Sequence, residues 1–268
     1  MTYQHLRYDV ADGVATIAFD RPDQLNAMNR RLMEEIIHAV DRLDTDANAR
    51  VGLLTGRGRA FMAGADLKEY ARQTPAEFES FQTLGRRLYA ALEGNAKPVV
   101  AAVNGHAFGG GFEIVLACDL VVAASGAKFA LPEILLHLIP GGGGTQRLPR
   151  KLGPARAHDL LFTGRAVTSE DLHAWGVVNH VYPREDFAAS ARAYAATIAA
   201  QSPEALRVLK QLAHLAAGPV SSAALALENE ALGRFYRSDA AQAKLAEFLR
   251  RSEERAAAKA AASASPTP

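Results

Sequence analysis

The stretch NGHAFGGGFEIVLACD, residues 104–119, sets three consecutive glycines directly before an apolar segment. A single carboxylate, Glu113, lies where that segment begins. Glycine loses more conformational freedom on folding than any other residue, so it is unfavourable inside a packed segment. A tight turn explains one or two of these glycines. Three beside a carboxylate indicate instead that another molecule comes close to the backbone here.

The composition argues against several classes of protein. The chain has 268 residues, 49% of them hydrophobic, and a net charge of +1. A charge so close to zero argues against nucleic acid as a partner. The single cysteine, Cys118, cannot form an intrachain disulfide or a cysteine-based zinc site, and we expect no metal. No signal-peptide core or membrane-length apolar run is present, so we expect a cytoplasmic protein without a membrane partner.

Apolar strands and an amphipathic helix alternate in the first half of the chain. Leucine, isoleucine and valine recur at helical spacing over residues 29–43, and Asn29 is the predicted N-cap. Short apolar runs predict buried strands at residues 13–19, 51–56, 97–105 and 119–125. Buried strands separated by helices indicate an α/β fold with a largely parallel sheet.

The second half of the chain is predicted to be mainly helical. One helix is expected over 152–164 and another over 168–176, where Thr168 and Asp171 have the spacing of a capping box. Beyond Ser202 the pattern is only helical, as in helices that pack on their own domain or on a neighbouring subunit.

These patterns divide the chain into three parts. Residues 1–198 are the expected core and carry the candidate site. Residues 199–255 are expected to form a helical oligomerisation region. The alanine-rich end, 256–268, has no apolar stripe and is predicted to be disordered.

Nucleotide binding explains the glycine run poorly. In a dinucleotide-binding G-x-G-x-x-G motif that starts at Gly109, the third glycine would fall at Ile114. A phosphate-binding P-loop also requires Gly-Lys-Ser or Gly-Lys-Thr, and neither follows the run.

An oxyanion site explains the glycines better. Backbone N–H groups at the start of a helix have no intrahelical acceptor, and glycine lets a substrate reach them. A second segment of small residues, 63–66, also follows an apolar strand and precedes an expected helix. Two such segments could aim two N–H donors at one oxygen. Within the second segment, capping by Asp66 and simple solvation of the neighbouring Lys68 are alternatives to a binding role.

A second carboxylate lies in the segment 129–150. Glu133 follows Pro132 among apolar residues, which favour the protonated form of a carboxyl group and suit it to proton transfer. The alternative is a glutamate that stabilises a helix N-terminus. The tetraglycine run 141–144 provides a further exposed backbone nearby.

Three motifs together resemble the enoyl-CoA hydratase (crotonase) family. They are AFMAGADLKE at 60–69, AAVNGHAFGGGFEIVLACDL at 101–120 and PEILLHLIPGGGGTQRLPR at 132–150. The resemblance extends in register from about residue 5 to about residue 255. It implies an α/β fold built as a spiral of ββα units, followed by helices that assemble homotrimers, often paired as hexamers.

The resemblance also implies roles for individual residues. Glu113 and Glu133 match the two catalytic glutamates of true hydratases, and Ala65 and Gly110 match the two oxyanion donors. The residues expected to bind the acyl-CoA substrate are Ala63, Ala65, Asp66, Leu67, Lys68, Gly110 and Gly141. The reaction implied is syn addition of water to a trans-2-enoyl-CoA, giving a 3-hydroxyacyl-CoA, without a cofactor.

The sequence departs from the family pattern at two positions. Ala130 and His137 stand where relatives usually have glycine. A histidine four residues after Glu133 could share a helical face with it and modify the acyl pocket, or it could point to solvent.

The same residues also allow alternative functions. An isomerase usually keeps one of the two glutamates, and other members of the family are lyases acting on different acyl-CoAs. A protein of another class would keep the fold as a non-catalytic RNA-binding or assembly module.

Overall fold

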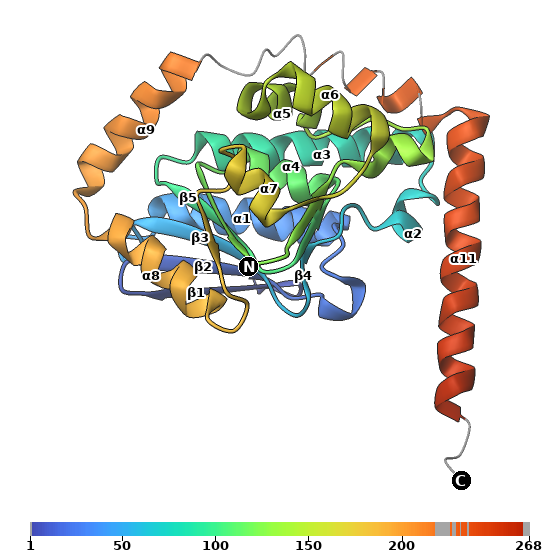
Figure 1. Ribbon diagram of the computed structural model, residues 1–268, viewed down its shortest axis with the longest axis horizontal. Coiled ribbons are helices and arrows are strands. Elements are labelled where there is room, and N and C mark those ends of the chain that lie inside the picture. Colours follow the sequence, from blue (N-terminus) through green and yellow to red (C-terminus); the bar gives the residue numbers. More distant parts are fainter. Residues whose placement is uncertain (1, 218–225, 227–228, 231, 235, 265–268) are drawn as a thin grey trace.

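Two sheets form the framework of the molecule (Figure 1). The computed structural model describes residues 2–217, 226, 229–230, 232–234 and 236–264. In this part of the chain the larger sheet has six strands in the order β1-β2-β3-β5-β7-β10. Its strands are β1 (Leu6–Ala11), β2 (Val14–Phe19), β3 (Val51–Gly56), β5 (Val99–Val103), β7 (Leu120–Ala124) and β10 (His180–Tyr182). All neighbours are parallel except the hairpin β1–β2.

The smaller sheet places its strands in the order β4-β6-β8-β9. Its strands are β4 (Ala60–Met62), β6 (His106–Phe108), β8 (Lys128–Ala130) and β9 (Val167–Thr168). The first three are parallel to one another, and β9 is antiparallel to β8. Carboxyl ends of parallel strands meet at one edge, so the segments that follow β4, β6 and β8 are brought together.

The chain repeats one unit as it alternates between the sheets. Strands β3, β5 and β7 enter the larger sheet, and each is followed by a short strand of the smaller sheet and then by helical residues. These helices are α2 (Leu67–Tyr70) with α3 (Pro75–Gly94), then α4 (Gly110–Ala117), then the 3₁₀ helix η2 (Pro132–Leu136) with α5 (Gly144–Leu152) and α6 (Pro154–Thr163). This succession is the expected spiral of ββα units.

Helices cover both faces of the larger sheet. Helix α1 (Arg30–Thr45) packs on one face and against α3, while α8 (Phe187–Ala199) packs on the other. Successive residues of β3 point to opposite faces of the sheet. Val51 and Leu53 pack with α8 on one face, and Leu54 packs with the main core on the other. Burial on both faces explains why these strands read as continuous apolar runs.

Several predicted element boundaries are confirmed. Asn29 caps α1 by accepting the Leu32 N–H at 2.8 Å. Thr168 and Asp171 form the predicted capping box of α7 (Ser169–Ala174). The strand predicted at 51–56 has these bounds.

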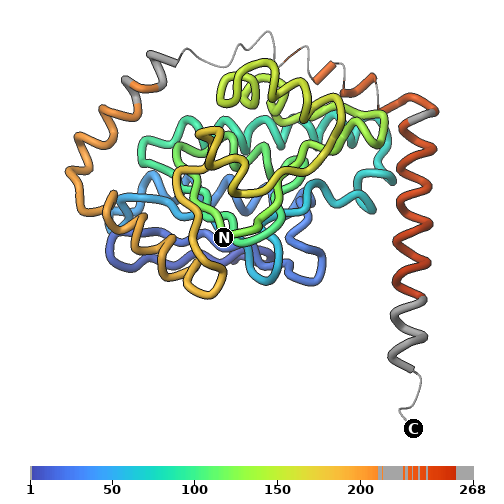
Figure 2. The backbone as a smooth tube through the Cα atoms, viewed as in Figure 1, coloured from blue at the N-terminus to red at the C-terminus, as the bar shows by residue number. Residues whose placement is uncertain are grey.

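The C-terminal helices extend away from the sheets. Helix α9 (Pro203–Ala217) and helix α11 (Asp239–Ala264) lie at opposite sides of the body (Figure 2). Of the tail 256–268, for which disorder is predicted, residues 256–264 continue α11 and residues 265–268 lie outside the described part. Alanine has the highest helix propensity, so this stretch needs no apolar stripe to remain helical.

Among the described helices, none combines the length and the apolar character that spanning a bilayer requires.

Candidate active site

The predicted site residues converge where β4, β6 and β8 end. Gly64 follows β4, Gly109 follows β6 and Glu133 follows β8. The Gly109 N–H donates to the Ala130 carbonyl at 3.0 Å, which ties the ends of β6 and β8 together. A Cβ atom added to Gly109 would lie 3.7 Å from the Gly64 Cα atom. The three segments that the sequence analysis selected are therefore neighbours.

Two backbone N–H groups at this edge are available to a ligand. Met28 pairs with the strand-like loop on either side of Ala65, donating to the Gly64 carbonyl at 2.7 Å and accepting the Asp66 N–H at 2.9 Å. In this pairing the Ala65 N–H points away from Met28. Gly110 begins α4, so its N–H has no intrahelical acceptor. No described residue accepts a hydrogen bond from either group.

Glu113 is buried in the first turn of α4 and is held by backbone donors. Its Oε1 accepts the N–H groups of Gly142 and Gly144, each at 2.8 Å, and the Tyr89 hydroxyl lies 3.5 Å from its Oε2. Burial raises the pKa of the Glu113 carboxyl, while the bonds from Gly144 and Gly142 and the charge of Arg147 oppose the rise. The site thus holds a basic carboxylate that is still stabilised as an anion.

The donors to Glu113 explain part of the tetraglycine run. A Cβ atom at Gly142 would lie 2.3 Å from the Tyr89 ring and 2.6 Å from Glu113 Oε2. A Cβ atom at Gly144 would lie 3.0 Å from Glu113 Oε1. Only glycine lets the backbone come this close to the carboxylate.

Glu133 lies in the first turn of η2 and faces the same cavity. Pro132 occupies the start of this 3₁₀ helix, where its missing N–H costs no hydrogen bond. A Cβ atom at Gly109, which has a φ of +50°, would lie 3.0 Å from Glu133 Oε1. Gly109, the first of the three consecutive glycines, therefore makes room for this carboxylate and supplies a left-handed backbone.

An ion pair supports the loop that holds Glu113. Arg147 is buried in α5, and its guanidinium binds both oxygens of Glu93 at 2.7 Å. The same guanidinium donates to the Gly142 carbonyl and lies 5.6 Å from the centroid of the Tyr89 ring. Arg147 therefore fixes the peptide that follows Gly142 and the ring that packs against Glu113.

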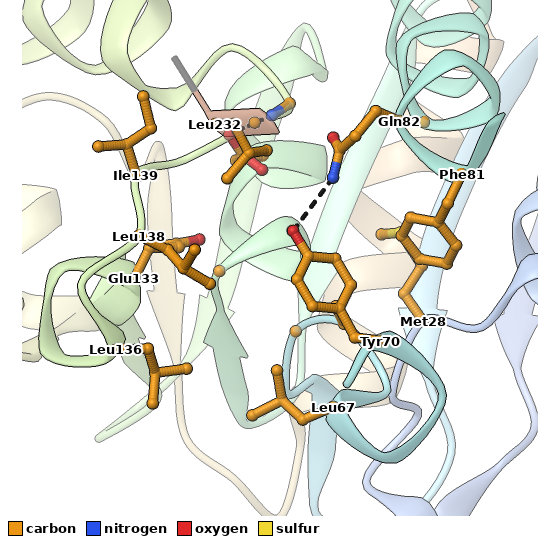
Figure 3. Close-up of a pocket in the computed structure, with 18 of the residues that line it drawn as sticks. Met28, Leu67, Tyr70, Phe81, Gln82, Glu133, Leu136, Leu138, Ile139 and Leu232 are labelled. Carbon is orange, nitrogen blue, oxygen red and sulfur yellow. Dashed lines mark hydrogen bonds between the residues drawn. The ribbon is translucent and has the colours of Figure 1, made fainter. Parts of the chain in front are cut away.

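A mainly apolar cavity of about 130 Å³ adjoins these groups. Figure 3 shows Glu133 on one side of the cavity and Tyr70, Phe81 and Met28 across from it. Gln82 donates from its side-chain amide to the Tyr70 hydroxyl at 3.1 Å. The cavity is large enough for a small acyl group beside both carboxylates.

The residues predicted to bind CoA divide into two sets. The set that lines the cavity consists of Ala63, Ala65, Leu67, Gly110 and Gly141. Asp66 and Lys68 are not among the lining residues. Asp66 is at the N-cap of α2 but makes no capping bond, and it pairs with Arg21 at 3.1 Å instead. Lys68 is exposed.

The suggestion that His137 modifies the pocket is not supported. Residue 137 ends η2 in the left-handed conformation, with a φ of +56°, so the helix does not continue through it. Its side chain is exposed and does not line the cavity, although those of Leu136 and Leu138 do. The left-handed backbone is the physical reason why glycine suits this position.

Sequence reasoning missed the residues of α3 that face the cavity. Gln82, Gly85 and Tyr89 are spaced by three and four residues and lie on one helical face. The signal for this helix was the capping box of Thr74 and Glu77, which the structure contains.

The sequence of the chain is similar to those of known proteins. The Enoyl-CoA hydratase/isomerase family model matches residues 9–256. A short-chain-enoyl-CoA hydratase of Clostridium acetobutylicum is 35% identical over 88% of this chain and 91% of its own length. A crotonyl-CoA hydratase of Syntrophomonas wolfei is 33% identical over 93% of this chain and 96% of its own length.

The fold agrees with a solved structure as well. An enoyl-CoA hydratase from Mycobacterium avium subsp. paratuberculosis superposes with a TM-score of 0.85, at 27% identity, covering 92% of this chain and 99% of its own. By its sequence, its fold and the family match over most of its length, the chain belongs to the enoyl-CoA hydratase/isomerase family.

Proposed function

We propose that this protein is an enoyl-CoA hydratase, a hydro-lyase that adds water across the double bond of a trans-2-enoyl-CoA. The observation that carries the proposal is the position of two glutamates, Glu113 and Glu133, beside the same cavity as two available backbone N–H groups. Relatives named as hydratases support this reaction. The presence of both glutamates favours hydration over double-bond isomerisation.

The backbone donors act on the thioester carbonyl. When water attacks C3, electrons move from the double bond toward this carbonyl and give its oxygen negative charge. The Ala65 and Gly110 N–H groups would bind that oxygen, and one such donor contributes about 3–4 kcal/mol to transition-state stabilisation in comparable sites. Because the donors belong to rigid backbone, they need no rearrangement during the reaction.

The two carboxyl groups divide the proton transfers. Ionised Glu113 orients the water and accepts one of its protons as the oxygen bonds to C3. Glu133, in its protonated form, gives its proton to C2 on the same face, which makes the addition syn. The raised pKa of Glu113, caused first by burial, makes it a stronger base than an exposed carboxylate. The product is a 3-hydroxyacyl-CoA, and proton exchange between the carboxyls restores the starting state.

The segment that includes Asp66 and Lys68 is proposed to bind the CoA portion, outside the acyl cavity. The exposed position of Lys68 suits an interaction with a phosphate.

We also propose that the protein is cytoplasmic and that residues 199–255 assemble homotrimers or hexamers. Exposed apolar residues on α9 and α11, such as Leu209 and Phe248, support assembly. Light scattering coupled to size exclusion would determine the number of subunits.

The test is the loss of the conjugated enoyl-thioester absorbance when pure protein is mixed with crotonyl-CoA, with identification of the product. We expect Glu133→Gln and Glu113→Gln each to lower kcat by about 10²–10⁴-fold, the usual contribution of a general acid or base. Glu185→Gln is the matched control, because Glu185 is exposed in the segment before α8. Folded wild-type protein that consumes neither crotonyl-CoA nor a longer enoyl-CoA would refute the proposal.

A further inference from the structure

A polar pair lies within the apolar part of the cavity. Tyr70 ends α2 and is 6% exposed, and Gln82 lies in α3 and is 8% exposed. Their side chains both line the cavity and are joined by the 3.1 Å hydrogen bond drawn in Figure 3. Phe81 and Leu232 are apolar lining residues in the same view. A tyrosine and a glutamine are costly choices for such a lining unless their polar atoms are used.

The pair is not saturated by its own hydrogen bond. In the described part of the chain, the Gln82 amide and the Tyr70 hydroxyl have no other hydrogen-bond partner. With the amide nitrogen toward Tyr70, the phenol proton and the Gln82 carbonyl oxygen remain available. With the amide turned over, the Gln82 N–H groups and the phenol oxygen remain instead. Either orientation leaves at least one donor and one acceptor.

The charges around the pair select against an anion. None of the described residues that line the cavity is a lysine, arginine or histidine, whereas Glu113 and Glu133 both do line it. Burial first, and then the Glu133 charge, raise the pKa of Tyr70 well above its usual range, so the phenol keeps its proton. A carboxylate placed beside the pair would meet two other carboxylates without a cation.

We propose that Tyr70 and Gln82 form a subsite for an uncharged hydroxyl group carried by the acyl chain of the substrate, beyond the reacting double bond. A hydroxyl group both donates and accepts, so it satisfies the donor and the acceptor that the pair presents. The inference rests on the proposed hydratase function and names its substrate class as hydroxylated enoyl thioesters.

The test compares kcat/KM for trans-2-hexenoyl-CoA, its 4-, 5- and 6-hydroxy derivatives, and a chain with a terminal carboxylate. We expect the wild-type protein to prefer one hydroxylated derivative over the parent by about tenfold, as one additional buried hydrogen bond predicts. The carboxylated chain should be poorer than the parent. Tyr70→Phe and Gln82→Leu keep the size of the side chains and should each reduce the preference to within about twofold.

A matched control separates polarity from packing. Tyr236→Phe removes a hydroxyl that bonds the Tyr70 carbonyl at 2.6 Å from outside the cavity. It should change kcat/KM for parent and hydroxylated substrates by the same factor. If only one of the two subsite variants folds, as judged by circular dichroism, that variant decides.

The outcomes are distinct. Wild-type protein that hydrates the parent but prefers none of the hydroxylated chains would overturn the subsite, as would a preference that survives the substitutions. A preference for the carboxylated chain would overturn its uncharged character. Failure to hydrate any of these substrates or crotonyl-CoA would refute the proposed function, and the subsite with it.

Discussion

Replacing Gly142 by alanine tests whether backbone donors hold Glu113 in the ionised form that its proposed role as a base requires. The added Cβ atom would lie 2.3 and 2.4 Å from two atoms of the Tyr89 ring and 2.6 Å from Glu113 Oε2. Ordinary contact between carbon atoms begins near about 3.5 Å, so the ring would have to retreat by about 1 Å. Tyr89 is buried and lies against Arg147, which leaves little room for this movement.

Two costs follow from the substitution. Overpacking in a buried site destabilises by about 1–3 kcal/mol. Displacement of the Gly142 N–H also removes a 2.8 Å hydrogen bond to a carboxylate, which is worth about 1.5–3 kcal/mol. If that second loss falls on the transition state, kcat decreases by about 10- to 150-fold.

The pH dependence of kcat provides a second test of the same substitution, because the direction of its shift can be predicted. The Gly142 N–H favours the ionised form of Glu113 and so opposes the rise in its pKa that burial causes. Removing the donor raises the pKa of Glu113 further. Since Glu113 must be ionised to accept a proton from water, the acid limb of the kcat profile should move to higher pH.

The assays are crotonyl-CoA hydration across pH and thermal unfolding of the same samples. Gly94→Ala is the matched control, because its added Cβ atom meets nothing within 4 Å beyond its chain neighbours and its own helix backbone, and its φ is not left-handed. This control should keep the wild-type rate and be neutral or stabilised by up to about 1 kcal/mol. Wild-type kcat with an unshifted acid limb in Gly142→Ala would refute the reasoning.

Three further substitutions test the supporting structure. Arg147→Met breaks the pair between the buried Arg147 and the partly exposed Glu93, and should lower both kcat and the free energy of unfolding by denaturant, the latter by about 1–3 kcal/mol; unchanged stability would contradict the supporting role. Glu170→Gln should destabilise by less than about 1 kcal/mol, because the group is exposed. Burial opposes the shift, but hydrogen bonds such as that from Ser125 lower the pKa of Glu170 to about 2. The stabilisation that its carboxylate provides is therefore complete above the pKa of the unfolded state and should disappear as pH falls from about 4.5 to 2. A stability difference between wild type and variant that stays constant across this acid titration would disprove the reasoning. His137→Gly should change stability by no more than about 1 kcal/mol and leave both the pH–rate profile and the chain-length preference unchanged, since the side chain lies outside the cavity.

Local patterns were enough to predict elements that local physics governs. The helix after Asn29 and the capping box at Thr168 depend on hydrogen bonds among near neighbours in the sequence. Buried strands such as β3 were predicted from apolar runs in the sequence. The strands β4, β6 and β8 are only three residues each, too short to show a period of two, and were not predicted.

The sequence by itself determined the α/β class and the family, and it selected Glu113 and Glu133 as the candidate catalytic residues, because glycines and carboxylates at fixed spacing form the family's motifs. Only the tertiary structure decided which backbone holds which carboxylate. Gly142 and Gly144 bind Glu113, which lies about thirty residues earlier in the chain, and Gly109 makes room for Glu133. Such contacts depend on how the ends of parallel strands meet in space. The order of residues along the chain does not reveal which of these ends lie close together.

The structure also decided which polar residues line the cavity across from Glu133, namely Tyr70 and Gln82. The 3.1 Å bond from Gln82 to Tyr70 joins two helices, and nothing in the local sequence of either helix indicates a partner on the other. His137 shows the converse, since proximity in sequence to Glu133 suggested a shared face that a left-handed backbone removes. Sequence spacing predicts neighbours only while the backbone keeps one regular conformation, and the site lies where those conformations end.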